Sequence, residues 1–300
     1  MLEDKRINLM VEPTNRCNLR CSTCFSHQDG RPKRDMALNE FKQIIDKNIN
    51  IIGNISLYNY GEPLLNKDIW KMVHYAKKMG IKFIKMTTNG MFLNKTNIKN
   101  LLKSRLDYLS ISLDGTTEEV YKQFRKGGDF KKVVSNIQSL IKIRDIIRSN
   151  LKVEIQFIIM RHNEHQIKLV EELARKLKAD ILRLKKVLVK RNEWDCLLPK
   201  SKAYNRYIDM KKYNVCFKPL KELVINCDGT VIPCCYIVAE DITKFKLGNG
   251  FQQSLKEIMN SINYKKFIER CTSQKSALSC CTDCNEGNLY LDYKVIKLNG

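Results

Sequence analysis

The first 190 residues alternate short apolar runs with amphipathic stretches, and this alternation limits the possible folds more than any other feature. The apolar runs predict strands at Ile7–Val11, Ile55–Tyr58, Phe83–Thr88, Tyr108–Leu113, Val153–Met160 and Ile181–Leu188. Helical periodicity predicts helices at Asn39–Asn48, Lys67–Met79, Lys95–Lys103, Thr117–Arg148 and Glu164–Leu177. Such alternation implies an α/β fold in which right-handed crossovers join parallel strands. A closed eight-fold barrel would need more chain, whereas a partial six-fold (β/α)6 TIM-like barrel fits the length.

Three cysteines follow the first predicted strand at the spacing CxxxCxxC: Cys17, Cys21 and Cys24. A closed structural zinc or iron–sulfur site normally has four protein ligands, so three thiolates leave one metal position open. This pattern favours a [4Fe–4S] cluster with one iron free to bind an outside ligand. The structural alternative is a zinc knuckle whose fourth ligand lies elsewhere in the chain.

The CxxxCxxC motif resembles the signature of the radical S-adenosylmethionine (SAM) superfamily. The resemblance implies that the open iron chelates the amino and carboxylate groups of SAM, and it implies the partial (β/α)6 barrel. It also implies reductive cleavage of SAM to a 5′-deoxyadenosyl radical, which takes a hydrogen atom from the substrate. In many family members an aromatic residue precedes the third cysteine. Here that residue is Thr23, so we expect another side chain, such as Phe25, to contact adenine.

Polar residues at the ends of later strands match other parts of the family pattern. Function in parallel barrels gathers where the carboxyl ends of strands meet the following loops. The run Gly61-Glu62-Pro63 resembles the element that binds the SAM amino group, and Arg125 resembles the residue that meets the SAM carboxylate. The full set of SAM-binding residues that the resemblance implies is Gly61, Glu62, Pro63, Asn89, Ser112, Asp114, Arg125 and Gln156.

The alternation stops after Lys190, cysteines become dense from Cys216 onward, and we expect a helix around Ser254–Ile268. We expect a barrel over residues 1–190, a connector over 191–214 and a small cluster domain over 215–300. The spacing resembles the twitch form of the SPASM domain, which implies one auxiliary [4Fe–4S] cluster on Cys216, Cys234, Cys281 and Cys284. Competing ligand sets draw on Cys227, Cys235, Cys271 and Cys280, and a structural zinc site is an alternative.

Twelve cysteines without an export signal predict metal sites in the cytoplasm rather than disulfides. The longest apolar runs are too short to span a membrane, so we expect no membrane partner. The net charge of +22 is spread along predicted helices rather than concentrated in one tract, which disfavours a nucleic-acid partner. The oligomeric state stays open. We expect a small-molecule or peptide substrate, and a reductant such as flavodoxin or ferredoxin.

The layout is closest to twitch-type dehydrogenases and epimerases, which implies oxidation or epimerisation of a carbohydrate-like or peptidyl substrate. Oxidation would pass an electron to the auxiliary cluster, whereas epimerisation would need a thiol that returns a hydrogen atom. Cys235 is the candidate donor, Cys227 is a weaker one, and candidate bases are Arg161, His162 and His165. The alternatives are a peptide-crosslinking enzyme, a nucleic-acid-modifying enzyme, and a non-catalytic iron–sulfur protein for electron transfer or sensing.

Overall fold

The computed structural model describes residues 6–27, 30–189, 192–208, 214–238, 240–282, 284 and 293–298. The chain forms two compact units, each built from several separate segments. Unit 1 comprises Met1–Cys17, Phe25–Met86 and Lys212–Asn288, and unit 2 comprises Asn18–Cys24, Thr87–Lys211 and Leu289–Gly300. The expected domain boundaries at residues 190 and 214 stay a prediction.

Unit 1 contains a mixed sheet in the order β3-β2-β1-β7-β8-β9. Strands β1, β2, β3 and β7 pair in parallel, whereas β8 and β9 continue the sheet antiparallel. Its strands are β1 (Ile7–Val11), β2 (Ile52–Leu57), β3 (Phe83–Thr88), β7 (Glu222–Ile225), β8 (Thr230–Ile232) and β9 (Gly248–Asn249). The pairing of β1 with β7 means that the cysteine-rich segment extends the same sheet as the first predicted strands.

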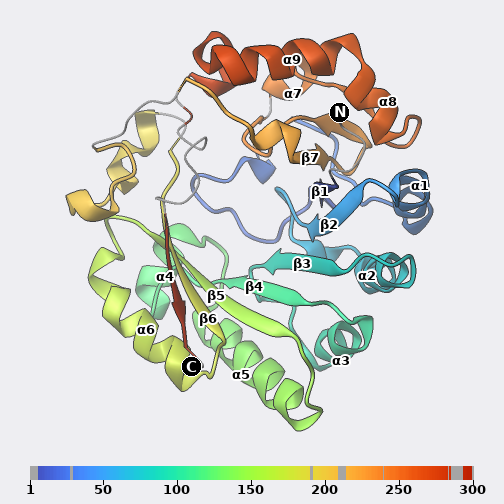
Figure 1. The fold of residues 1–300 in the computed structure, drawn as a ribbon. Coiled ribbons are helices and arrows are strands. Elements are labelled where there is room, and N and C mark those ends of the chain that lie inside the picture. The colour runs from blue at the N-terminus through green and yellow to red at the C-terminus, as the bar shows by residue number, and fades with distance from the viewer. Residues whose placement is uncertain are drawn as a thin grey trace. The chain divides into compact units, whose positions relative to one another are not determined.

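Five α-helices belong to unit 1 among the described residues. They are α1 (Leu38–Asn48), α2 (Ile69–Lys78), α7 (Glu240–Lys244), α8 (Leu255–Asn260) and α9 (Ile262–Ser273). Helices α1 and α2 pack against each other, with Phe41, Ile44 and Met72 fully buried (Figure 1). Apolar side chains at helical spacing explain this packing, because one stripe of each helix can face the core.

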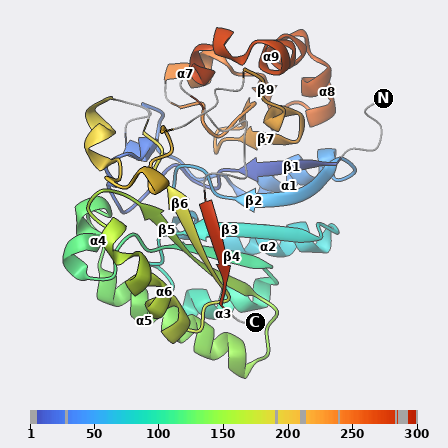
Figure 2. The same cartoon turned by 60° about the vertical axis from the view of Figure 1, so that its left-hand side comes forward.

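Unit 2 contains the sheet β10-β6-β5-β4. Its strands are β4 (Tyr108–Ser112), β5 (Lys152–Ile159), β6 (Ile181–Lys186) and β10 (Tyr293–Lys297). Its α-helices are α3 (Lys95–Ser104), α4 (Glu118–Phe124), α5 (Phe130–Ile146) and α6 (Ile167–Lys176). Strands β4, β5 and β6 pair in parallel, and α6 runs along β5 and β6 (Figure 2). The expected alternation of parallel strands and helices is therefore confirmed.

The single helix expected over Thr117–Arg148 is instead two helices, α4 and α5. Helix α4 ends at Phe124, and Gly127 in the junction that follows adopts a φ of +86°, which residues with a Cβ rarely adopt. Asp129 then starts α5, since its side chain accepts a hydrogen bond from the Lys132 amide at 2.9 Å. The sequence signal for this break is the pair Gly127-Gly128, which interrupts the helical periodicity.

Two further elements differ from expectation. The helix expected around Ser254–Ile268 is divided at Ser261 into α8 and α9, because the Ser261 hydroxyl caps α9 through the Tyr264 amide at 3.2 Å. Strand β10 was not expected, and it pairs antiparallel with β6. Its pairing partner lies more than a hundred residues away in the sequence, so no local pattern indicates it.

Candidate active site and auxiliary cysteine cluster

The loop of unit 2 that carries two of the three N-terminal cysteines is fixed by backbone and side-chain hydrogen bonds. The Cys24 amide donates to the Cys21 carbonyl at 3.0 Å, and the Arg20 amide donates to the Lys126 carbonyl at 2.9 Å. The Asn89 amide group donates to the Asn18 side-chain oxygen at 2.9 Å. Asn89, one of the residues expected to bind SAM, therefore also positions the cysteine loop.

A buried ion pair lies beside Cys21. The Arg125 guanidinium donates to Asp114 at 2.5 Å, and its Nη1 lies 3.5 Å from the Cys21 Sγ. Asp114 is fully buried and also accepts the Ile158 amide at 2.7 Å. Burial raises the pKa of Cys21, whereas the Arg125 charge lowers it, so the guanidinium favours the thiolate that iron requires.

The structure thus brings together three of the residues expected at the site: Cys21, Asp114 and Arg125. Although burial opposes it, the charge of Asp114 raises the pKa of Arg125, which therefore stays protonated. Ser112 is buried at the end of β4, and Gln156 is half-buried on β5. The Ser110 hydroxyl, on the same strand as Ser112, donates to Glu154 at 2.8 Å.

In unit 1 the segment before Cys17 packs tightly against the Gly61-Glu62-Pro63 turn. A Cβ on Gly61 would lie 1.9 Å from the Thr14 carbonyl oxygen, so only glycine fits there. The Glu62 amide donates to the Arg16 carbonyl at 2.8 Å. The Glu62 carboxylate is 2% exposed and accepts the Leu64 amide at 3.1 Å, which caps the short helix η2 (Pro63–Leu65).

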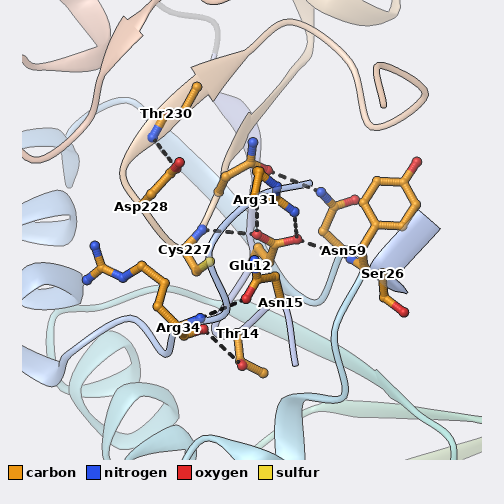
Figure 3. Close-up of polar contacts among 12 residues, drawn as sticks. Glu12, Thr14, Asn15, Ser26, Arg31, Arg34, Asn59, Cys227, Asp228 and Thr230 are labelled. Carbon is orange, nitrogen blue, oxygen red and sulfur yellow. Dashed lines mark hydrogen bonds and ion pairs between the residues drawn. The ribbon is translucent and has the colours of Figure 1, made fainter. Parts of the chain in front are cut away.

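A buried glutamate that sequence analysis did not single out connects three segments of unit 1 (Figure 3). Glu12 directly follows β1, is fully buried, and pairs with Arg31 through two contacts of 2.8 and 3.0 Å. It also accepts the amides of Cys227 at 3.1 Å and Tyr60 at 3.4 Å. The signal that could have revealed it is an acidic residue directly after a buried strand, which needs a partner.

Cys227 lies in this polar network, where its amide donates to Glu12 (Figure 3). Burial and the Glu12 charge raise the pKa of its thiol, so it stays protonated. The neighbouring Asn226 is fully buried, and its side-chain oxygen accepts from Asn59 at 3.3 Å. The structure therefore gives Cys227 a surrounding different from that of the expected cluster ligands.

Six other C-terminal cysteines gather on one apolar core of unit 1, which we call the auxiliary core. Its buried members are Met10, Cys216, Val224, Ile232, Ile237, Ile242, Phe267, Cys271 and Leu278. Packed against them are Tyr58, Cys234, Cys235, Phe245, Cys280 and Cys281. Of the four expected ligands, the auxiliary core thus contains or contacts Cys216, Cys234 and Cys281.

The thiols of the auxiliary core touch one another in pairs. The Cys271 thiol contacts those of Cys216 and Cys281, and the Cys280 Sγ lies 3.6 Å from the Cys281 Sγ. Contact with the Cys271 thiol, the largest of several influences, lowers the pKa of Cys216 to about 6. In the part of the chain that the structure describes, no three donors surround one point as they would for a single metal ion. Each iron of a [4Fe–4S] cluster takes a separate thiolate, so its donors can be spread over several segments.

The other residues discussed above lie as follows. Cys235 receives a contact from the Lys218 ammonium at 3.5 Å, and the Tyr60 hydroxyl donates to its carbonyl at 3.1 Å. Phe25 packs edge-on against Tyr60, with ring centres 6.0 Å apart. His162 is half-buried, and burial lowers its pKa. No described helix is long and apolar enough to cross a bilayer.

Comparison with known families gives two matches. The model of the radical SAM superfamily matches residues 11–174, and that of an iron–sulfur cluster-binding domain, SPASM, matches residues 216–285. A GTP 3′,8-cyclase of Clostridium botulinum (strain Hall) is 35% identical over 144 residues, which are 46% of this chain and 45% of the relative. An Fe-coproporphyrin III synthase of Methanosarcina barkeri is 26% identical over 172 residues, covering 57% of this chain and 41% of the relative. The chain thus spans about half the length of these relatives or less.

Solved structures with similar folds cover nearly the whole chain. BtrN in complex with AdoMet and 2-DOIA superposes with a TM-score of 0.61 at 18% identity, covering 94% of each chain. Streptococcus suis SuiB bound to S-adenosylmethionine has a TM-score of 0.72 at 16% identity, covering 94% of this chain and 73% of SuiB. These similarities confirm the partial TIM-like barrel with a small C-terminal cluster domain.

The two family matches also confirm the expected cofactors. A radical SAM domain uses a [4Fe–4S] cluster and SAM, and a SPASM domain binds auxiliary iron–sulfur clusters. Such clusters need thiolate donors, and Cys17, Cys21, Cys24 and the thiols of the auxiliary core remain the proposed ones. The radical SAM match spans more than half of the chain, so the chain belongs to the radical SAM superfamily. It also carries a SPASM domain near its C-terminus.

Proposed function

We propose that this radical SAM enzyme oxidises or epimerises a carbohydrate-like or peptidyl substrate. The observation that carries the proposal is the gathering of six cysteines on the auxiliary core. A second redox centre suits both outcomes, because oxidation must remove an electron from the substrate radical and epimerisation must return one to a spent thiol. A flavodoxin or ferredoxin is the proposed external reductant, and the cytoplasm is the proposed location.

When bound, the first cluster and SAM supply the reductive cleavage that generates the oxidising radical. In our proposal, Cys17, Cys21 and Cys24 hold that cluster, and Arg125 keeps positive charge beside the Cys21 thiolate. The buried Asp114 fixes the orientation of the guanidinium through a charge-assisted hydrogen bond. The proposed SAM-binding residues remain Gly61, Glu62, Pro63, Asn89, Ser112, Asp114, Arg125 and Gln156.

Two structures of similar fold support the proposed substrate class. They are BtrN in complex with 2-DOIA and SuiB bound to its precursor peptide SuiA. The cyclase relative suggests a second outcome, in which the substrate radical forms a new bond within or between substrates. Peptide crosslinking is therefore the alternative reaction. Cys235 is the proposed hydrogen-atom donor for epimerisation, because the neighbouring Lys218 and Tyr60 fix its position.

The class of chemistry is tested by anaerobic reconstitution with iron and sulfide, followed by dithionite and SAM. We expect 5′-deoxyadenosine from the intact protein and none from Cys17→Ala, which lacks one cluster ligand. If 5′-deoxyadenosine failed to form while iron analysis found both clusters, the chain would instead be an electron-transfer or sensor protein.

The reaction is tested by running the same mixture in heavy water with pools of aminocyclitols, monosaccharides and short peptides. Oxidation predicts a product that has lost a pair of hydrogens. Epimerisation predicts an isomer that carries solvent deuterium on carbon, and this product should disappear in Cys235→Ala while 5′-deoxyadenosine still forms. A product that carries a new bond between two residues or two carbons, with neither hydrogen loss nor inversion, would contradict the proposal. Such a product would support crosslinking instead.

A further inference from the structure

Lys218 places a positive charge beside the Cys234-Cys235 pair, which packs on the auxiliary core. It is the first residue of the short helix η6 (Lys218–Leu220), and it follows Cys216 by two positions in the sequence. Its Nζ lies 3.5 Å from the Cys235 Sγ, and its side chain is only 14% exposed. A largely buried ammonium thus lies next to the segments that carry two of the expected cluster ligands, Cys216 and Cys234.

One carboxylate faces this ammonium. The Oε1 of Glu222, at the start of β7, lies 3.5 Å from the Lys218 Nζ. This separation exceeds the usual length of a charge-assisted hydrogen bond, about 2.8 Å. The Lys218 Nζ also lies over the Tyr236 ring, 5.0 Å from its centre. The ammonium is therefore shared between the Glu222 carboxylate and the Cys235 sulfur, which lie at the same distance from it.

A charge in this position acts on any redox centre that the neighbouring thiolates hold. The potential of an iron–sulfur cluster depends on the net charge around it, on hydrogen bonds to its sulfurs and on solvent exposure. Reduction adds one electron, so the reduced cluster carries one more negative charge than the oxidised cluster. A nearby ammonium stabilises the reduced cluster more, and low exposure strengthens the effect because little water screens the charge. A nearby carboxylate acts in the opposite direction.

We propose that Lys218 raises the reduction potential of the auxiliary [4Fe–4S] cluster and that Glu222 limits this effect. The inference rests on the SPASM domain and on the expected ligands Cys216 and Cys234, and it deepens the proposed function. In oxidation, the substrate radical would pass one electron to the oxidised cluster while a base takes the proton that the radical loses. A raised potential favours this transfer, so Lys218 favours oxidation over epimerisation.

The test uses the full-length chain with the three N-terminal cysteines changed to Ala, so that only the auxiliary cluster can form. Into this background we introduce Lys218→Met, Lys218→Arg, Glu222→Gln or Lys221→Met, and we reconstitute each protein with iron and sulfide. Lys221 is the matched control, because its side chain is exposed in the same segment. The reduction potential is measured by redox titration followed by electron paramagnetic resonance, after iron analysis. No SAM or substrate is present, so the outcome is independent of the proposed reaction.

We expect Lys218→Met to lower the ratio of reduced to oxidised cluster about tenfold at the midpoint potential of the background protein. This change corresponds to a shift of about 59 mV to more negative potential. Glu222→Gln should shift the potential in the positive direction, whereas Lys218→Arg should stay close to the background protein because it keeps the charge. Lys221→Met should change little, since solvent and salt screen an exposed charge.

The opposite signs separate an effect of charge from an effect of packing. Damage to the fold around the cluster would not shift the potential one way when a cation is removed and the other way when an anion is removed. The proposal is overturned if Lys218→Met shifts the potential no more than Lys221→Met does, or if Glu222→Gln shifts it in the same direction as Lys218→Met. It is also overturned if the background protein forms no reducible cluster.

Discussion

At the scale of single residues, buried charges determine how the candidate site is held together. Glu12 and Arg31 form one such pair in unit 1, and Asp114 and Arg125 form another in unit 2. Both carboxylates are fully buried and accept a backbone amide in addition to the arginine. The main effect of such a buried pair on stability is the cost of breaking it, because removing one partner leaves a buried charge without compensation.

The first prediction concerns Glu12. Glu12→Gln should lower the free energy of unfolding by about 3–5 kcal/mol, because Arg31 would keep its charge in a buried site. The measurement is urea denaturation followed by circular dichroism. Glu171→Gln is the matched control, since its pair with Arg175 is exposed and should be worth less than about 1 kcal/mol. Equal losses in the two variants would contradict the structural role given to Glu12.

The second prediction concerns pH and His162. Burial lowers its pKa in the folded state, so the unfolded chain binds a proton at higher pH than the folded chain does. The stability that neutral His162 contributes is therefore complete above pH of about 6.5 and is lost as pH falls toward the folded-state pKa. The free energy of unfolding, measured from pH 7.5 down to about 5, should fall less steeply in His162→Gln than in the wild-type protein. Parallel declines would mean that other groups cause the pH dependence.

At the scale of elements, short junctions separate helices that were each expected to be continuous. Gly127 lies between α4 and α5, Asp129 caps the start of α5, and Ser261 separates α8 from α9. The first junction also supports the cysteine loop, because the Lys126 carbonyl accepts the Arg20 amide. A break between two helices thus contributes directly to the position of the candidate site.

The third prediction tests this junction. Asp129→Ala should lower the free energy of unfolding by about 1 kcal/mol, since α5 would lose its N-terminal cap. Asp129→Asn keeps an acceptor at the same place and should lie within a few tenths of a kcal/mol of the wild type. Denaturant titration of the three proteins makes the comparison. A large loss in Asp129→Asn would show that its negative charge matters rather than the cap.

At the scale of the whole molecule, two features stand out: a large positive charge and a cysteine-rich core. The net charge of +22 comes from 54 basic and 32 acidic residues. Six cysteines form or line the auxiliary core, and some of the apolar contacts there are supplied by thiols rather than larger side chains. We therefore expect this core to depend on metal for part of its stability.

The fourth prediction follows from this dependence. Removing iron with a chelator under oxidising conditions, followed by reduction and desalting, should lower the melting temperature by about 6–12 °C, if the cluster contributes about 3 kcal/mol. The control is the variant with Cys17, Cys21 and Cys24 changed to Ala, which isolates the auxiliary cluster. An unchanged melting temperature after complete iron loss would mean that the auxiliary core is stable without metal.

The sequence by itself determined the strand–helix alternation, the three N-terminal cysteines and the turn at Gly61, because these depend on local periodicity and spacing. It also placed Arg125 and Asp114 at the site, through strand ends and family resemblance. Only the tertiary structure paired Arg125 with Asp114 beside Cys21, joined Glu12 to Arg31 and Cys227, and brought Cys271 to Cys216 and Cys281. Those contacts join residues far apart in the chain. Burial in the folded core, rather than spacing along the chain, decides which thiols and charges meet. For this reason the sequence left several cysteine ligand sets open.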